Sequence, residues 1–454
     1  MDLQKIKYIA DRYYINLDGF DLNNLNNFAT DATFSMQQAI YIHEYYHYLT
    51  NITTFFGVRQ FNCAFQDKVR LITILLKKAG LDAFPIGTNS RADCAYEIEY
   101  WKSVDDIMNL DDLDKDFYEK VMKSPNKRFT ITNYTKKFIP VSAVKDGVLQ
   151  KGAHSYYEIA IDGVPTANSF NLSDGMIDEF LNRSIDEYLF EHDMADNCDV
   201  LRSQDFYPYQ VYDELIHYFG FDRVDTRLKI MLAYFALHSF NPVVCLIETL
   251  EVIKMYGFEI FANDPEAFLL NRLQGNELRC YAMILDNERI YVNECLLHGR
   301  KNLADTMTLI YQKQYDAYHL LGKDFFYFIR PFFIPNIDDL SGRQKFLKMF
   351  LDIRSQMAEP ILVQGGKMID ADKDSFKNHL AFHIAAYEIF DSLYAYRIAQ
   401  RLPKRKMRYK YPVESPDTDK LESLPDVLPL IETWHVALND LSLYAVYLNE
   451  KKKP

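Results

Sequence analysis

The chain has 454 residues, of which 48% are hydrophobic and 15% aromatic, and it carries a formal net charge of −13. This composition excludes disordered and repetitive classes, and the length allows a large core divided into lobes. The negative charge argues against a nucleic-acid partner, because phosphate backbones are bound by clustered positive charge. Six scattered cysteines form no C-x-x-C pair, and neither a secretion signal nor a membrane-spanning stretch is found. We therefore expect a cytoplasmic protein with reduced thiols.

The first predicted elements are a strand within residues 12–19 and a helix that begins near Met36. Ser35 and Gln38 have the spacing of a capping box, in which each side chain bonds the backbone N–H of the other. Apolar residues and histidines then recur at three- and four-residue steps, which indicates a helix with one inward stripe. We expect the helix to end near Gly57, where a left-handed C-cap costs little.

This helix contains the pattern His43-Glu44-x-x-His47. Two imidazoles four residues apart project from the same helical face, so both can bind one Zn²⁺ while the intervening glutamate reaches a water molecule. Such a pattern is typical of zinc-dependent hydrolases. The alternative is that the two histidines are ordinary core residues, but burying them with a glutamate and no cation requires unusual polar partners.

The rest of the chain predicts a mainly helical, α+β protein. Between residues 128 and 172, β-favouring runs separated by Asp146-Gly147 and Asp162-Gly163 predict a small antiparallel meander. Helical patterns occupy residues 61–78, 224–256, 302–321, 376–402 and 424–448. The predicted division is an N-terminal helical lobe over residues 1–125, the meander over 126–172, a helical lobe over 173–322 that carries the third ligand, and a C-terminal helical region over 323–454.

A catalytic zinc site needs a third protein ligand and an open fourth position. Our prediction is His192, in a helix that begins at Ser173, because it shares the inward stripe of that helix. Asp196, one turn later, would orient the imidazole. Glu191 projects toward the flank and is the alternative in this cluster. A core histidine bonded to Asp196 without a metal is the other interpretation.

Two further clusters remain open as sources of the third ligand. Glu294 and His298 lie one turn apart, although Gly299 directly after them favours a salt-bridged pair near a helix end. His379 and His383 also have helical metal-ligand spacing, but no glutamate stands beside the first of them.

The segment from His43 to Leu49, followed by Thr53-Thr54-Phe55-Phe56-Gly57, resembles the active-site helix of zincin metallopeptidases. It is more closely similar to uncharacterised bacterial H-E-x-x-H proteins, which have later segments like residues 192–195 and 206–209. The resemblance implies a multi-helical fold around a zincin-like active-site helix. At the position where gluzincin-like enzymes hold a glutamate ligand, this chain has His192, with Glu191 one step earlier.

The implied activity is zinc-dependent hydrolysis of peptide bonds in a specific protein or peptide substrate. Zn²⁺ held by His43, His47 and His192 lowers the pKa of bound water, and Glu44 acts as the general base. We expect the edge of the meander to receive the substrate as an added strand. The alternative function is a metal-stabilised, catalytically inactive interaction or regulatory protein. A regulatory protein partner fits either function, whereas a nucleic acid or a membrane fits neither.

Overall fold

The computed structural model describes residues 6–9, 14–26, 34–61, 128–145, 148–164, 167–194, 209–221, 224–273, 301–358, 360–364 and 367–369, with isolated positions between 117 and 123 and between 281 and 296. Two predicted helices, over residues 376–402 and 424–448, lie outside these ranges, as does nearly all of the helix predicted over residues 61–78. None of the described helices is both long and apolar enough to cross a membrane.

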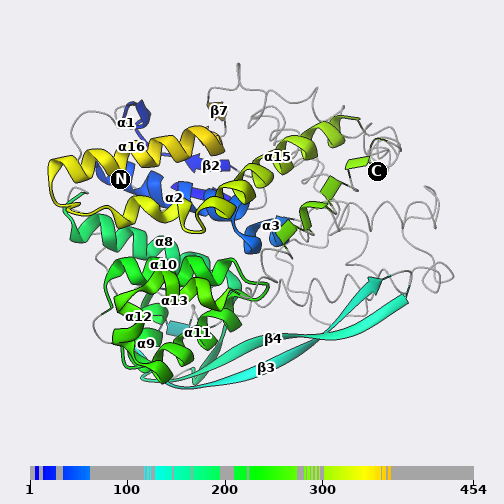
Figure 1. The fold of residues 1–454 in the computed structure, drawn as a ribbon, viewed down its shortest axis with the longest axis vertical. Helices are drawn as coiled ribbons and strands as arrows, with labels where there is room; N and C mark the ends of the chain where they lie inside the picture. Colours follow the sequence, from blue (N-terminus) through cyan, green and yellow to red (C-terminus); the bar gives the residue numbers. More distant parts are fainter. Residues whose placement is uncertain are drawn as a thin grey trace.

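Helix α2 (Met36–Thr53) carries the H-E-x-x-H motif and begins at the predicted capping box. The Ser35 hydroxyl accepts from the backbone N–H of Gln38 at 3.3 Å, and the Gln38 side chain accepts from the Ser35 N–H at 2.9 Å. Nearly every residue of α2 is buried, on all faces, because helices and strands surround it (Figure 1). Tyr41 and Tyr45, which the periodicity places away from the inward stripe, are therefore core residues as well.

Three buried tyrosines of α2, namely Tyr45, Tyr46 and Tyr48, direct their hydroxyl groups to backbone carbonyls of distant segments. Tyr46 donates to the Phe328 carbonyl at 3.1 Å, and Tyr48 donates to the Met357 carbonyl at 3.2 Å. A buried tyrosine contributes a large apolar area, but its hydroxyl must find a partner. These hydrogen bonds satisfy that requirement and connect the motif helix to the 3₁₀ helix that contains Phe328 and to the last residue of α16 (Leu340–Met357).

Helix α2 ends earlier than predicted. Its C-cap is Thr54, and α3 (Phe55–Phe61) continues through Gly57. A Cβ atom at Gly57 would lie 2.3 Å from the Cα of Asn51, a distance at which something must shift. Gly57 is therefore needed for the close approach of α3 to the end of α2, and the predicted role as a left-handed cap is wrong.

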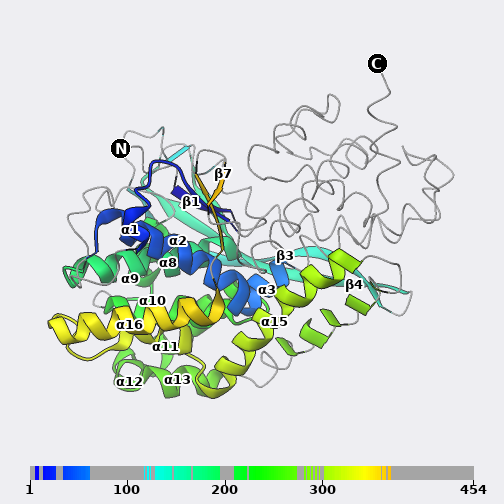
Figure 2. The ribbon, with the colours of Figure 1, turned by 90° about the horizontal axis from the view of Figure 1, so that it is seen from above.

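Helix α8 (Asp174–Glu191) packs beside α2 in the opposite direction (Figures 1 and 2). Ser173 caps its start, accepting from the Met176 N–H. At its other end, Met194 donates to the Leu189 carbonyl and Asp193 has a φ of +49°, as in a Schellman motif. Its antiparallel course brings the middle of α8 alongside the histidines of α2.

The other helices bounded within the described residues pack against these two or against one another. They are α1 (Asn23–Asn26), α9 (Tyr209–Tyr218), α10 (Thr226–Leu237), α11 (Pro242–Tyr256), α12 (Phe258–Asn263), α13 (Pro265–Arg272), α15 (Lys301–Lys323) and the 3₁₀ helix η5 (Tyr327–Phe333). The helical stretch predicted over residues 224–256 consists of α10 and α11. They separate where Asn241 caps α11 and Pro242 occupies its first turn, a position at which proline needs no N–H donor.

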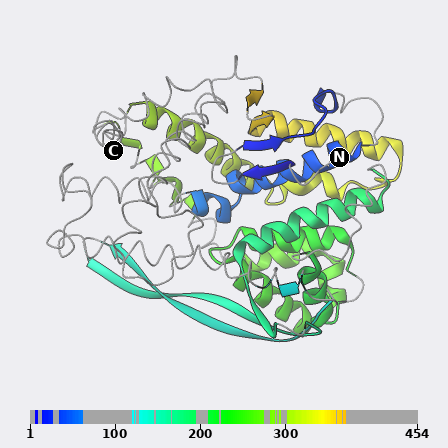
Figure 3. The same cartoon turned by 180° about the vertical axis from the view of Figure 1, so that it is seen from behind.

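The predicted meander is confirmed. It consists of β3 (Thr130–Lys145), β4 (Val148–Asp162) and β5 (Ser169–Leu172), with antiparallel pairing in the order β3-β4-β5. Strands β3 and β4 form a long two-stranded ribbon. One end of the ribbon lies beside α9, and the other end extends well beyond the helices (Figures 1 and 3). Together with the helices, this sheet confirms the mainly helical, α+β class.

A second, smaller sheet was only partly anticipated. Its order is β1-β2-β6-β7, with β2 (Tyr14–Leu17) inside the predicted strand and β1 (Ile6–Ile9) antiparallel to it. β2 also pairs in parallel with β6 (Ile361–Gln364), which pairs with β7 (Lys367–Ile369). Segments from the start of the chain and from beyond residue 360 thus share one sheet, and Figure 3 shows β1 and β2 lying across α2.

Candidate metal centre

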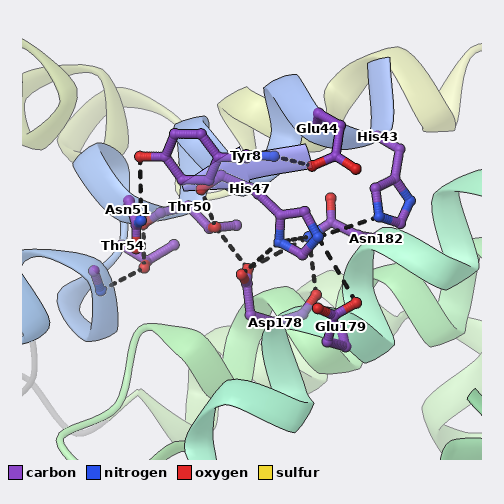
Figure 4. Close-up of polar contacts among 11 residues, drawn as sticks. Tyr8, His43, Glu44, His47, Thr50, Asn51, Thr54, Asp178, Glu179 and Asn182 are labelled. Atoms are coloured by element: carbon purple, nitrogen blue, oxygen red, sulfur yellow. Dashed lines mark hydrogen bonds and ion pairs between the residues drawn. The ribbon is translucent and has the colours of Figure 1, made fainter. Parts of the chain in front are cut away.

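The two motif histidines are buried between α2 and α8. Each directs its Nδ1 atom at a carboxylate of α8: His43 at Asp186 Oδ2, 2.9 Å away, and His47 at Asp178 Oδ2, 2.7 Å away. Figure 4 shows the contact between His47 and Asp178. A carboxylate accepts hydrogen bonds, so the hydrogen of each neutral imidazole lies on Nδ1. Both Nε2 atoms then carry a lone pair. This is the arrangement by which outer carboxylates orient metal-binding histidines.

These two Nε2 atoms lie 3.2 Å apart. Two lone pairs that face each other at this distance repel unless a cation, either a proton or a metal ion, lies between them. Two ligands about 2.1 Å from one zinc ion in tetrahedral coordination are themselves about 3.4 Å apart. The spacing of the Nε2 atoms therefore suits a shared metal ion.

Glu179 completes a set of three candidate ligands. Its Oε2 lies 3.8 Å from His47 Nε2, and one ligand atom from each of His43, His47 and Glu179 falls within 4.8 Å of the other two. The Glu179 side chain is 39% exposed, which leaves one side of the group open to solvent. This group can hold a metal ion, and two histidines with one glutamate form a known ligand set of catalytic zinc sites.

The surrounding carboxylates favour positive charge at both imidazoles. Burial lowers the pKa of His47, but Asp178 and Glu179 outweigh it and raise the pKa to about 10. Burial likewise lowers the pKa of His43, whereas the charge and hydrogen bond of Asp186 raise it, with a net increase. A cation bound at Nε2 meets the same favourable field as a proton does.

The Asp178 side chain is itself held in place. The Thr50 hydroxyl donates to its Oδ1 at 2.6 Å, which leaves Oδ2 for His47. The amide group of Asn182, one turn further along α8, donates to the same Oδ1 at 3.4 Å and to the backbone carbonyl of Asp178 at 2.9 Å (Figure 4). Because these contacts come from both α2 and α8, the orientation of His47 depends on how the two helices pack.

Glu44 lies on the same helix, with only 8% of its surface exposed. Burial raises the pKa of its carboxyl, while His43, His47 and a hydrogen bond from the backbone of Tyr8 lower it, with a net increase. Tyr8 belongs to β1, so a strand of the four-stranded sheet contacts this carboxylate. The meander packs against α9 and α11, and its expected role in receiving the substrate stays a prediction.

The structure does not bring His192 to the histidine pair. His192 is the C-cap of α8, thirteen residues after Glu179, or about 20 Å along a helix. Its Nδ1 pairs with Asp338 at 2.7 Å. The sequence pattern extends the helix through Ala195, but the left-handed turn at Asp193 ends it. Since α8 runs antiparallel to α2, His192 lies near the start of α2, and the place predicted for it is taken by Glu179.

Of the other candidate third ligands, the structure describes only Glu191. Glu191 accepts a hydrogen bond from Thr226 at 2.5 Å and is not part of the group around His43. The remaining alternatives lie outside the described residues: Glu294, His298, His379 and His383.

Sequence reasoning missed the acidic residues of α8, although a signal for them exists. Asp178, Asn182 and Asp186 recur at four-residue steps, a polar stripe on a helix that also carries a buried apolar stripe. Asn182 and Asp186 are no more than 2% exposed. Buried polar groups need partners, so an inward polar stripe on one helix indicates a complementary stripe on another.

Comparison of the chain with protein-family models, with curated proteins and with solved structures found no match in any of the three.

Proposed function

We propose that this chain is a zinc-dependent metallopeptidase that hydrolyses peptide bonds in a specific protein or peptide substrate. The observation that carries the proposal is the pair of Nε2 atoms 3.2 Å apart, each belonging to an imidazole whose Nδ1 is held by a carboxylate. Glu179 beside them supplies the third ligand, and Glu44 follows the first histidine in the chain.

His43, His47 and Glu179 would hold the ion, and zinc is the ion that two imidazoles and one carboxylate favour in hydrolytic sites. When bound, zinc supplies Lewis acidity, which lowers the pKa of water and polarises a carbonyl group. The partly exposed Glu179 side chain marks the side from which a substrate approaches.

Glu44 performs the proton transfers of this proposal. Water adds to the scissile carbonyl carbon and loses a proton to Glu44, and the C–N bond then breaks as Glu44 passes that proton to the leaving amine. The burial of Glu44 raises the pKa of its carboxyl, which strengthens it as a base toward water. The two products are a carboxylic acid and an amine.

The alternative is a metal-stabilised interaction or regulatory protein without turnover. A purely structural zinc site closes its fourth position and needs no general base. The presence of Glu44 beside the ligand group and the 39% exposure of Glu179 both favour the peptidase.

The test compares the zinc-loaded wild-type protein with the Glu44→Gln variant on a library of natural peptides, with cleavage products identified by mass spectrometry. We expect both proteins to hold about one zinc ion, and only the wild type to cleave. Equal cleavage by the two proteins would contradict the proposed role of Glu44. A folded, zinc-loaded wild type that cleaves nothing, including intact proteins from a cell extract, would support the regulatory alternative.

A further inference from the structure

Tyr8 makes three contacts with one face of the motif helix. Its backbone N–H donates to Glu44 Oε2 at 2.5 Å, its ring meets the ring of Tyr48 edge-on at 6.1 Å between centroids, and its hydroxyl accepts from the Asn51 side chain at 3.2 Å. Glu44, Tyr48 and Asn51 are spaced four and three residues apart, so they share this face. The three contacts fix both the main chain and the side chain of Tyr8 against α2, and Figure 4 shows the hydrogen bonds with Glu44 and Asn51.

The Tyr8 N–H that donates to Glu44 faces away from the neighbouring strand, β2. β1 is the outer strand of the described sheet, and Tyr8 lies opposite Ile15 of β2. In an antiparallel ladder, the N–H groups of successive residues point alternately toward the partner strand and away from it. Because the Tyr8 N–H reaches Glu44, it points away from β2, and the Lys7 N–H points toward β2.

The motif helix also contacts the segment that leads into β6, an inner strand of the same sheet. Tyr45 donates to the Ala358 carbonyl at 3.0 Å, directly before the segment that becomes β6. Ala358 has a φ of +64°, a left-handed conformation that costs free energy in a residue other than glycine. Since β6 pairs with β2 and β2 pairs with β1, side chains of α2 contact this sheet at β1 and at the segment that leads into β6.

We infer that the backbone N–H of Tyr8 is a positioning group for the general base. By holding Oε2 of Glu44, it fixes the plane of the carboxylate and leaves Oε1, on the side of His43, to exchange protons with water and the leaving amine (Figure 4). The inference rests on the proposed peptidase function. It makes strand β1 part of the catalytic geometry through its main chain, so the role does not depend on the side chain at position 8.

The contact itself is tested by amide hydrogen exchange on the full-length, zinc-loaded protein, resolved to single residues by fragmentation mass spectrometry. We expect the Tyr8 amide to exchange about tenfold faster in Glu44→Ala than in wild type, as for loss of one hydrogen bond to a charged group. Glu44→Gln, which keeps an acceptor oxygen, should stay close to wild type. The Lys7 amide is the internal control and should be unchanged. Equal exchange of the Tyr8 amide in all three proteins would overturn the inference.

The catalytic consequence is tested with two substitutions at position 8. Tyr8→Pro removes the N–H, which a strand tolerates where that group faces away from the ladder. Tyr8→Ala also loses the side chain but keeps the N–H. On a peptide that the wild type cleaves, we expect kcat of Tyr8→Pro to be roughly tenfold below that of Tyr8→Ala, with the same KM and zinc content. An equal or higher kcat in Tyr8→Pro would overturn the inference.

The two arms separate failure of the inference from failure of the proposed function. If the wild type cleaves peptides but neither exchange nor kcat responds, the positioning role is wrong and the peptidase proposal stands. If the wild type holds zinc and cleaves nothing, the peptidase proposal is wrong, and a catalytic role for Tyr8 is wrong with it, whatever the exchange rates show.

Discussion

His47 and His238 are both buried histidines, yet their surroundings have opposite effects on positive charge. His47 lies among carboxylates, and Asp178 and Glu179 raise its pKa to about 10 against the effect of burial. His238 follows α10 and packs against the rings of Tyr234 and Phe325, and burial alone lowers its pKa to about 3. Its Nε2 has no hydrogen-bond partner among the described residues.

The comparison shows that burial alone does not suit a histidine to binding a cation. Removing an imidazole from water disfavours the charged form in both places. What differs is whether acidic side chains accompany it, so that a cation is stabilised once it arrives. The α2–α8 interface provides these acids, and the aromatic surroundings of His238 provide none.

The largest effect expected from this comparison is complete loss of the metal. His43→Ala and Glu179→Ala should each reduce the metal content from about one ion per chain to near zero, because two remaining ligands hold zinc weakly. His238→Ala and His192→Ala should both keep it. Elemental analysis after dialysis gives the answer. Loss of metal from His192→Ala with retention in Glu179→Ala would restore His192 as the third ligand.

A smaller effect should follow from neutralising the outer carboxylates. Asp178→Asn and Asp186→Asn should each weaken zinc binding by about 10- to 100-fold, since the orienting acceptor and its charge are lost. Asp338→Asn is the matched control, because it removes the same kind of carboxylate from His192, far from the candidate centre. Competition with a zinc-binding dye measures all three variants. Equal affinity of the three would mean that the carboxylates do not support the ligands.

The smallest expected effect is a difference in how stability depends on pH. The pKa of His47 rises from 6.5 to about 10 on folding of the metal-free protein, so its contribution is fully present below pH 6.5 and is lost as pH rises through 10. His238 has a lowered pKa, so its contribution is present above pH 6.5 and is lost as pH falls toward 3.

Thermal unfolding of chelator-treated protein between pH 6.5 and 10 measures the first of these effects. Relative to wild type, His47→Gln should show a smaller fall in Tm over this range, and His238→Phe should follow the wild-type curve. Zinc-loaded wild type should also fall less than the metal-free protein, because the ion replaces the proton. Parallel curves for wild type and His47→Gln would contradict the assigned pKa of His47.

Several local features of the fold were predictable because they depend on neighbouring residues in the chain. The capping box at Ser35 and the turn at Gly163, which has a φ of +102°, follow from local chemistry and are confirmed. The end of α2 was predicted wrongly, because Gly57 is required by contact with Asn51, which sequence propensity does not reveal. β1 is a strand of only four residues that packs against α2. A segment this short has too few residues to show a periodic pattern, so the sequence did not indicate the strand or its contact with α2.

The sequence by itself determined that His43, Glu44 and His47 share a helix with metal-binding spacing, because the geometry of a helix converts four-residue steps into one face. Only the tertiary structure decided which carboxylates meet them. The antiparallel packing of α8 sets Asp186 beside His43 and Asp178 beside His47, with Glu179 as the third candidate ligand. Helical periodicity indicates which way a side chain points, whereas the register between two helices depends on the packing of both. That register places Glu179, and not His192, beside His43 and His47.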